Sequence, residues 1–157
     1  MIRKAMLRDL AALVSGNVRM ALETENLTLD VNTVTAGVRA LLENQVPGTY
    51  WVVEEEGAVV AQLLITHEWS DWRNRDVWWI QSVYVPKEFR GRGLYRKLYE
   101  FVLEEATRAG AGGLRLYVDT SNERAQAVYS TLGMDGQHYR VFERMLPEAP
   151  TRDRDER

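Results

Sequence analysis

The residues best suited to chemistry are basic side chains and glycines gathered between positions 87 and 97. This segment carries one acidic residue, Glu88, against Lys87, Arg90, Arg92, Arg96 and Lys97. Gly91 and Gly93 stand among them, and glycine lets a backbone close around an anion without a Cβ in the way. The composition of the segment therefore indicates a site for a phosphate or pyrophosphate group.

The flanking residues predict that this segment begins a helix. Residues 80–85 are mostly β-branched or aromatic, which favours a strand, and Pro86 ends it. After the glycines, apolar residues recur at helical spacing at Leu94, Leu98, Phe101, Val102 and Ala106. The first N–H groups of a helix lack partners and carry the positive end of its dipole. The alternative is an ordinary capped helix with a solvated basic face.

Two common nucleotide-binding motifs are absent from this segment. The P-loop pattern GxxxxGK[ST] does not occur, and the dinucleotide pattern GxGxxG lacks its third glycine and the acidic residue that binds a ribose. A nucleotide-phosphate binder would also need a Mg²⁺-ligand motif, which is missing.

Residues 90–95 resemble the acetyl-CoA signature Q/R-x-x-G-x-G/A of the GNAT superfamily of N-acetyltransferases. Arg90 fills the first position and Gly93 the fourth, whereas Tyr95 stands where Gly or Ala is usual. The family's second region is a strand, an Asn and a helix ending in A-x-x-x-Y-x-x-x-G-F. It is matched by Asn122, Ala125, Tyr129 and Gly133, with Met134 in place of the Phe. The resemblance covers residues 1–146.

The resemblance implies an α/β fold with a mixed, mostly antiparallel central sheet flanked by helices. The central strands would splay apart so that the pantetheine arm of acetyl-CoA enters between them and pairs with the backbone of residues 83–85. The pyrophosphate would bind the amides of residues 92–96, with Arg90 and Arg92 nearby. The cofactor-binding residues implied are Val83, Tyr84, Val85, Arg90, Gly91, Arg92, Gly93, Leu94, Tyr95, Arg96 and Asn122.

Tyr129 is the catalytic residue that the resemblance implies. It matches the tyrosine that protonates the leaving thiolate in many family members, and an unperturbed Tyr has a pKa of about 10, so it keeps a proton to donate at neutral pH. The alternative is that Tyr129 only packs its helix against the protein. Asn122 either contacts the cofactor arm or caps the following helix, and the two roles are compatible.

No general base can be assigned from the sequence. Several relatives carry a Glu where this chain has Gln81, and an amide cannot accept a proton, although it can hold a water molecule. The candidates nearby are His67, Glu68, Asp71 and Asp76. Each is better explained as a polar residue at a strand end or turn.

Tryptophan is concentrated between residues 69 and 79, at Trp69, Trp72, Trp78 and Trp79. These indoles either wall an acceptor pocket, with Glu68, Asp71 and Asp76 attracting a cationic amine, or pack across strands or at a dimer surface. The two interpretations are equally supported.

The chain as a whole predicts the element order β-α-α-β-β-β-α-β-α-β in one domain, residues 1–146. Residues 147–157 form a charged tail that composition predicts to be disordered. The expected strands are 2–6, 50–53, 58–65, 77–85, 114–118 and a last extended segment, 137–145. The expected helices are 8–22, one capped by Asp30, one from Leu94, and 123–132, with a loop at 23–29 and a turn at 69–75.

The amino-acid composition excludes several further classes of protein and of functional site. The 157 residues are 45% hydrophobic and 27% charged with a net charge of −3, which suits one globular domain and argues against nucleic-acid or anionic-membrane binding. The absence of cysteine excludes a disulfide and a cysteine-acyl intermediate, and only two histidines argue against a metal site. Because no signal peptide or 18-residue apolar run is present, we expect a cytoplasmic protein.

These observations predict an acetyl-CoA-dependent N-acetyltransferase acting on a primary amine by direct attack in a ternary complex. A small amine is favoured as acceptor, and a protein N-terminus or lysine is second. The rival is a CoA-binding regulatory module without turnover: Gln81 and Tyr95 support it, and Tyr129 and Asn122 oppose it. The family's members are often dimers, so the resemblance also suggests a homodimer.

Overall fold

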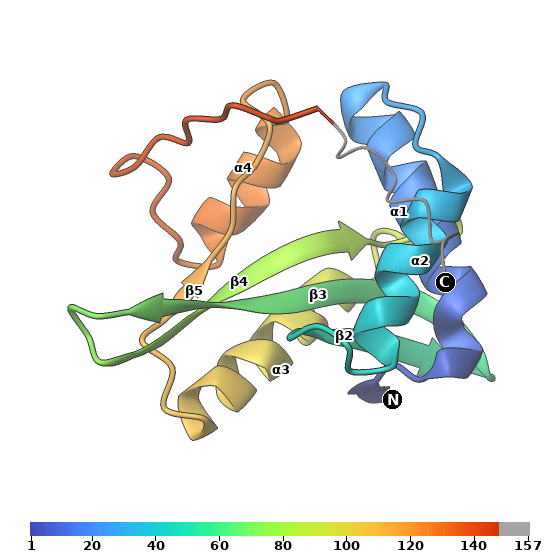
Figure 1. Ribbon diagram of the computed structural model, residues 1–157, viewed down its shortest axis with the longest axis horizontal. Helices are drawn as coiled ribbons and strands as arrows, with labels where there is room; N and C mark the ends of the chain where they lie inside the picture. The colour runs from blue at the N-terminus through green and yellow to red at the C-terminus, as the bar shows by residue number, and fades with distance from the viewer. Residues whose placement is uncertain (148–157) are drawn as a thin grey trace, which may run out of the picture.

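The computed structural model describes residues 1–147, which form one sheet flanked by helices (Figure 1). The strands are β1 (Ile2–Lys4), β2 (Thr49–Glu55), β3 (Ala58–Ser70), β4 (Arg75–Tyr84) and β5 (Leu114–Arg115). The α-helices are α1 (Leu10–Glu25), α2 (Val31–Leu42), α3 (Leu94–Arg108) and α4 (Glu123–Thr131), with 3₁₀ turns η1 (Leu7–Asp9) and η2 (Lys87–Phe89). The charged tail predicted for 147–157 lies, apart from Pro147, outside the described residues.

The sheet order follows the chain, β1-β2-β3-β4-β5, and every neighbouring pair is antiparallel except β4 and β5. This confirms the predicted fold class. The parallel pair is short, since only Trp78 and Trp79 lie opposite Leu114 and Arg115. Beyond these pairs the chain leaves β4 and runs toward α4 (Figure 1). The two central segments therefore separate after a brief contact.

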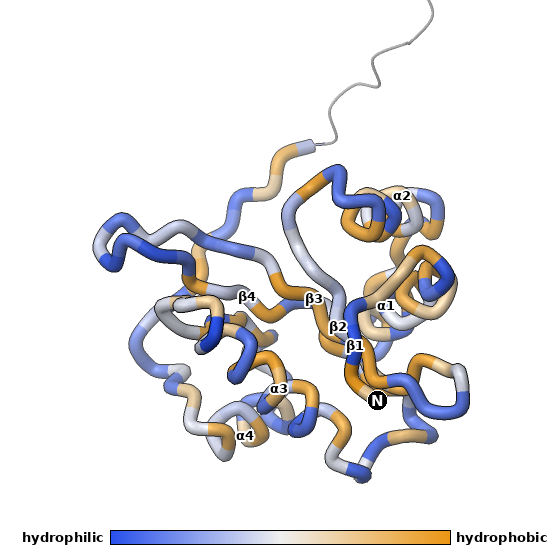
Figure 2. The backbone as a smooth tube through the Cα atoms, turned by 90° about the horizontal axis from the view of Figure 1, so that it is seen from below, coloured by the Kyte–Doolittle hydropathy of each residue, from blue (hydrophilic) through white to orange (hydrophobic). Residues whose placement is uncertain are grey.

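Each face of the sheet is covered by its own helices: α1 and α2 lie on one side, and α3 lies on the other (Figure 2). The period-two alternation of β2 produces this division. Tyr50 and Val52 pack with Leu13 and Val38 of the first pair of helices. The intervening residues Trp51 and Val53 pack instead with α3, in a cluster that includes Leu98 and Val102.

Helix α1 is anchored to β3 by buried polar side chains. The Gln62 side chain is 2% exposed, and its Nε2 donates to Asn17 Oδ1 at 2.9 Å. Asn17 Nδ2 donates in turn to the Tyr50 hydroxyl at 2.9 Å. A Cβ on Gly16 would lie 2.2 Å from Gln62 Oε1, so glycine is what permits this close approach. The contact fixes the course of α1, whose last turn enters the site described below.

Several predicted boundaries were wrong. Helix α1 extends to Glu25 instead of ending at 22, and Asn26 ends it in the left-handed conformation, with φ of 51°. β3 and β4 are longer than expected, so the turn between them is confined to residues 71–74. β5 stops at Arg115 instead of reaching 118.

The last extended segment predicted at 137–145 forms no strand within the described residues. A strand needs a hydrogen-bonded neighbour, and β5, which ends at Arg115, supplies no long edge for one. Asp30 does cap α2, as predicted, by accepting from the Thr33 backbone N–H at 2.8 Å. Within residues 1–147, no helix is long and apolar enough to cross a membrane.

Candidate active site

β4 carries a bulge just before it ends. Gln62 lies opposite Tyr84 and Leu64 lies opposite Gln81, so β4 has one more residue between these pairs than β3. Ser82 takes up the extra residue with φ of 51°, an uncommon conformation for a residue with a side chain. A bulge bends its strand and redirects the residues that follow. Residues 83–85, which follow it, line the main cavity of the protein.

The turn into α3 is built on two glycines in the left-handed conformation, Gly91 with φ of 76° and Gly93 with φ of 71°. Gly93 is the N-cap of α3, and no side chain caps the helix there. A Cβ at either glycine would meet no atom within 4 Å, so the space in front of this turn is open. An uncapped helix start with open access suits a phosphate group. We call residues 90–96 the cradle.

Carboxylates hold the arginines of the cradle in this structure. Arg90 donates from Nε to the Val85 carbonyl at 2.8 Å and from a terminal nitrogen to Glu23 Oε2 at 2.5 Å. Arg92 bonds both carboxylate oxygens of Glu55, at 2.9 and 3.0 Å. Neither pair is deeply buried, so each is weak enough for a stronger anion to displace.

Glu23 also accepts a hydrogen bond from the Tyr84 hydroxyl at 2.9 Å. Burial raises the pKa of the Glu23 carboxyl, but the hydrogen bonds from Arg90 and Tyr84 more than offset burial, and the pKa lies below its usual value. Glu23 is therefore a carboxylate at neutral pH. It links the end of α1 to the end of β4 and to the cradle.

The cavity has a volume of about 500 Å³ and lies among the last turns of α1, the end of β4, the start of α3 and the first turns of α4. The structure brings together around it many of the residues that the sequence predicted for the site: Val83, Tyr84, Val85, Arg90, Tyr95, Asn122 and Tyr129. These residues come from segments on either side of the gap between β4 and the chain that follows β5.

The other predicted residues, Gly91, Arg92, Gly93, Leu94 and Arg96, do not line the cavity and belong to the cradle beside it. Leu94 is 4% exposed and its side chain packs in the core beneath α3. It can contribute only its backbone N–H to a ligand. Arg96 pairs with Glu100 along the helix at 2.9 Å, on an exposed face.

Tyr129 is half-buried in α4, and burial raises the pKa of its hydroxyl, so it carries its proton at neutral pH. Its ring meets the ring of Tyr95 edge to face, with centroids 5.9 Å apart. Asn122 caps α4 by accepting from the Ala125 backbone N–H at 3.1 Å, which confirms the predicted cap. Its contact with a cofactor stays a prediction.

Sequence reasoning missed the part of the cavity wall that α1 contributes, above all Glu23, which was expected, with Thr24, in a loop. The left-handed Asn26 is a common helix C-terminal residue, and it was the one local signal that α1 continues to Glu25. The other missed lining residues are Met20, Thr24, Ser121, Arg124, Ala125 and Val128.

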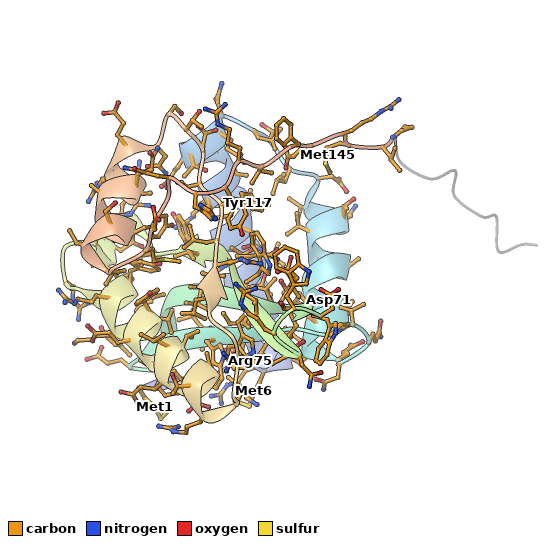
Figure 3. All side chains as sticks on the ribbon, turned by 90° about the vertical axis from the view of Figure 1, so that its left-hand side faces the viewer. Met1, Met6, Asp71, Arg75, Tyr117 and Met145 are labelled. Carbon is orange, nitrogen blue, oxygen red and sulfur yellow. The ribbon has the colours of Figure 1, made fainter. Side chains whose placement is uncertain are left out.

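The candidate bases lie elsewhere. His67 contacts Asp76 at 3.6 Å, and Glu68 pairs with Arg115, both toward the tip of the β3–β4 hairpin, which Figure 3 shows with Asp71 and Arg75 labelled. None of the four candidates lines the main cavity. The structure therefore does not select a general base among them.

The four indoles do not form a common pocket in the part of the chain that the structure describes. Trp69 and Trp72 are 63% and 87% exposed. The ring of Trp78 meets that of His67 at 5.4 Å, whereas the adjacent Trp79 meets Tyr117 at 6.2 Å. Successive strand residues point to opposite faces, so two of these side chains pack on different sides of the sheet. Both rings take part in aromatic packing, and Trp78 also lines a second cavity, of about 400 Å³, together with His67.

A splayed sheet with a bulge, an uncapped glycine-rich helix start and a half-buried tyrosine beside the gap are the features that the resemblance implies for a CoA-dependent acyltransferase. Residues 20–134 match the family described as the acetyltransferase (GNAT) family. The chain belongs to this family, which confirms the resemblance that its two motifs indicated. The family's description agrees with the predicted class, an N-acetyltransferase with acetyl-CoA as the donor.

Similar proteins agree with this assignment. A crystal structure of a possible acetyltransferase from Clostridium difficile 630 superposes with a TM-score of 0.87 at 39% identity, covering 94% of this chain and 98% of that one. The thialysine N-ε-acetyltransferase of Bos taurus is 36% identical over 75 residues, 48% of this chain and 44% of that protein. The Mus musculus protein of the same name is 33% identical over 81 residues, 51% of this chain and 47% of that protein. The chain thus matches less than half the length of these curated relatives.

Proposed function

We propose that this protein transfers the acetyl group of acetyl-CoA to a small primary amine, by direct attack of the amine on the thioester. The observation that carries the proposal is the cavity, because the end of β4, Arg90 and Tyr95 of the cradle, and Tyr129 all line it although they are far apart in the sequence. A cytoplasmic location stays part of this proposal.

The cradle is suited to the pyrophosphate of the donor. Its uncapped N–H groups and helix dipole favour an anion. Arg90 and Arg92, now paired with Glu23 and Glu55, can exchange these carboxylates for phosphate oxygens. Val83, Tyr84 and Val85 would then hold the pantetheine arm through their backbone, as the family resemblance implies.

The bound thioester supplies an activated acetyl carbonyl. The amine nitrogen forms a bond to the carbonyl carbon, the bond from that carbon to sulfur breaks, and the electron pair leaves with sulfur. The Tyr129 hydroxyl gives its proton to the resulting thiolate, and the amine loses a proton to water. The absence of cysteine fits transfer without an acyl-enzyme, because the most common acyl-accepting nucleophile is missing.

The charges of the cavity support a cationic acceptor. Glu23 is a carboxylate at the end of α1, and its pKa lies below its usual value. When Arg90 turns to the pyrophosphate, Glu23 is left facing a cavity of about 500 Å³ without its cationic partner. A small ammonium ion restores that pairing. The names of the relatives, thialysine N-ε-acetyltransferases, indicate a side-chain amine of an amino acid as a first acceptor to test.

The test is a thiol-release assay with acetyl-CoA and a panel of amines that includes thialysine, lysine, short polyamines and a peptide N-terminus. Because the chain has no cysteine, every thiol detected comes from released CoA. We expect release that depends on one small amine, with a matching gain of one acetyl group in its mass.

Binding of acetyl-CoA without release for any amine would favour the regulatory module instead. Acetylation of the peptide alone would replace the small acceptor with a protein N-terminus.

A further inference from the structure

Tyr95 has a buried hydroxyl that the proposed reaction does not yet use. The oxygen has almost no exposed surface and no hydrogen-bond partner among residues 1–147. A buried polar group without a partner is rare and costs free energy in the folded state. Phenylalanine would fill the same space without that cost, so the hydroxyl calls for an explanation.

The position of Tyr95 links its hydroxyl to the proposed active site. Tyr95 occupies the site of the acetyl-CoA signature where Gly or Ala is usual, in the first turn of α3. It lines the same cavity as Tyr129. The two rings are edge to face with centroids 5.9 Å apart and an interplanar angle of 71°. The two side chains thus share one wall of the cavity, and catalytic hydrogen bonds commonly tighten only when the substrate is bound.

We infer that Tyr95 is a positioning residue for Tyr129, to whose phenolic oxygen its hydroxyl donates a hydrogen bond once Tyr129 has passed its proton to the CoA thiolate. The inference rests on the proposed role of Tyr129 as the acid. In atoms, the Tyr129 O–H bond breaks and an S–H bond forms. The Tyr95 proton stays on its own oxygen and stabilises the negative charge left on Tyr129. A hydrogen bond to a charged oxygen is stronger than one between neutral groups.

The surroundings of the two hydroxyls indicate which one donates the hydrogen bond and which one loses its proton. Burial, followed by the neighbouring Tyr129 and Tyr99, raises the pKa of Tyr95 far above its usual value, so Tyr95 keeps its proton. Burial also raises the pKa of Tyr129, but the neighbouring Tyr95 hydroxyl acts in the opposite direction. Tyr95 is therefore the donor and Tyr129 the group that loses its proton.

Few other charges face the pair. Glu23 of α1 and Arg90 of the cradle are bonded to each other, and Tyr84 at the end of β4 donates to Glu23. Arg124 on α4 is exposed, and Tyr99 lies one turn along α3 with its ring 6.3 Å from that of Tyr95. Of these neighbours, Tyr95 is the one whose ring contacts the ring of Tyr129.

The test compares Tyr95→Phe with Tyr99→Phe, which removes a hydroxyl from the same helix but outside the cavity wall. We expect Tyr95→Phe to lower kcat about tenfold, as for loss of one hydrogen bond to a charged group. Its KM for acetyl-CoA should change less than about twofold, and the basic limb of its kcat profile should move to higher pH, because Tyr129 loses the donor that lowers its pKa. Tyr99→Phe should leave all three unchanged.

The double variant Tyr95→Phe/Tyr129→Phe separates a positioning role from an independent one. If Tyr95 acts through Tyr129, adding Tyr95→Phe to Tyr129→Phe should change kcat by less than about twofold. A further tenfold loss would mean that Tyr95 acts on the substrate itself and would overturn the inference. So would a Tyr95→Phe variant with normal kcat. If Tyr129→Phe alone is fully active, the proposed acid is wrong and the inference fails with it.

A readout without turnover keeps the inference testable for any acceptor. In protein whose tyrosines carry ¹³C at the hydroxyl-bearing ring carbon, the Tyr129 resonance titrates at the pKa of Tyr129. We expect that pKa to rise in Tyr95→Phe, by about one pH unit, and not in Tyr99→Phe. An unchanged pKa would overturn the inference. Thermal unfolding should not weaken in Tyr95→Phe, because the change removes an unpaired hydroxyl; a clearly lower Tm would point to a structural contact and would also overturn it.

Discussion

Two regions rich in aromatic residues lie at opposite ends of β4, and they differ in how far other elements of the fold enclose them. At the end of β4, Tyr84, Tyr95 and Tyr129 surround a cavity and are buried or half-buried. At its beginning, the tip of the β3–β4 hairpin carries Trp69 and Trp72 largely in solvent. Both regions are candidate binding surfaces by composition, but only the first is enclosed by several elements.

The candidate active site differs from the hairpin tip in being enclosed by several elements, and not in its content of aromatic residues. The cavity is built where α1, β4, α3 and α4 converge, so its side chains are fixed by packing from several directions. The hairpin tip is a turn at residues 71–74 whose backbone bonds mainly with itself, as in the contact from Arg73 N to the Ser70 carbonyl at 3.2 Å. Binding sites are generally concave and largely pre-formed, so the comparison supports the proposal that both substrates bind in the cavity.

The largest effect that we expect comes from Tyr129→Phe. Removing the acid should lower kcat by about 10² to 10⁴, the range typical of general acid–base catalysis, with little change in KM for acetyl-CoA. Steady-state kinetics with the best amine of the panel give the measurement. A variant with more than half of the normal kcat would show that the thiolate takes its proton elsewhere, and the cavity would lose its chemical distinction from the hairpin tip.

Gly93→Trp tests the cradle, with an expected loss of about 100-fold in acetyl-CoA affinity. The indole would fill the open space before α3 where the pyrophosphate is expected to sit. Gly110→Trp is the matched control, because Gly110 has φ of 73°, has no atom within 4 Å of its Cβ position, and lies at the other end of α3. Calorimetric titration with acetyl-CoA and with CoA measures both variants. Equal losses in the two would mean that strain in α3, and not occlusion of the cradle, is responsible.

The cradle could be predicted from the sequence because its signal is local. Glycine is the residue that most readily takes the positive φ seen at Gly91 and Gly93, and apolar spacing predicts the helix that follows. Glu23 could not be predicted, because it meets Tyr84 and Arg90 across 61 and 67 residues of chain. Such pairings depend on how α1 is seated on β3, which no local pattern encodes.

The predictions that the structure contradicts failed for the same reason, because they depend on contacts between segments far apart in the sequence. Residues 137–145 have a composition that suits a strand, but a strand forms only beside a partner, and β5 ends at Arg115. For the tryptophans the sequence left two interpretations open, and alternation along the strand sends Trp78 and Trp79 to opposite faces. Composition indicated what each segment favours, and tertiary contacts decided whether it was realised.

Glu23→Gln should have a smaller effect and in the opposite direction. It removes the charge that competes for Arg90, so we expect acetyl-CoA to bind about threefold more tightly at low salt, since a partly exposed ion pair contributes roughly 0.2–1 kcal/mol. The gain should shrink as salt screens the pair. Glu100→Gln, which frees only the exposed Arg96, is the control and should change nothing.

A loss of affinity in Glu23→Gln would show instead that Glu23 orients Arg90 for the donor. In the amine assay the same variant should raise KM for the acceptor, if Glu23 pairs with its ammonium group. The two readouts together separate the donor and acceptor halves of the cavity.

Trp72→Ala is expected to have the smallest effect. The side chain is 87% exposed, so its removal should leave Tm, acetyl-CoA affinity and the amine KM unchanged within error. Trp79→Ala is the contrasting variant, because that ring packs against Tyr117 at the base of the same hairpin and its loss should destabilise the fold by about 1–3 kcal/mol. If Trp72→Ala raised the amine KM tenfold while Tm held, the acceptor would bind at the hairpin tip. The cavity would then be the donor site only, because the one element the two regions share is β4.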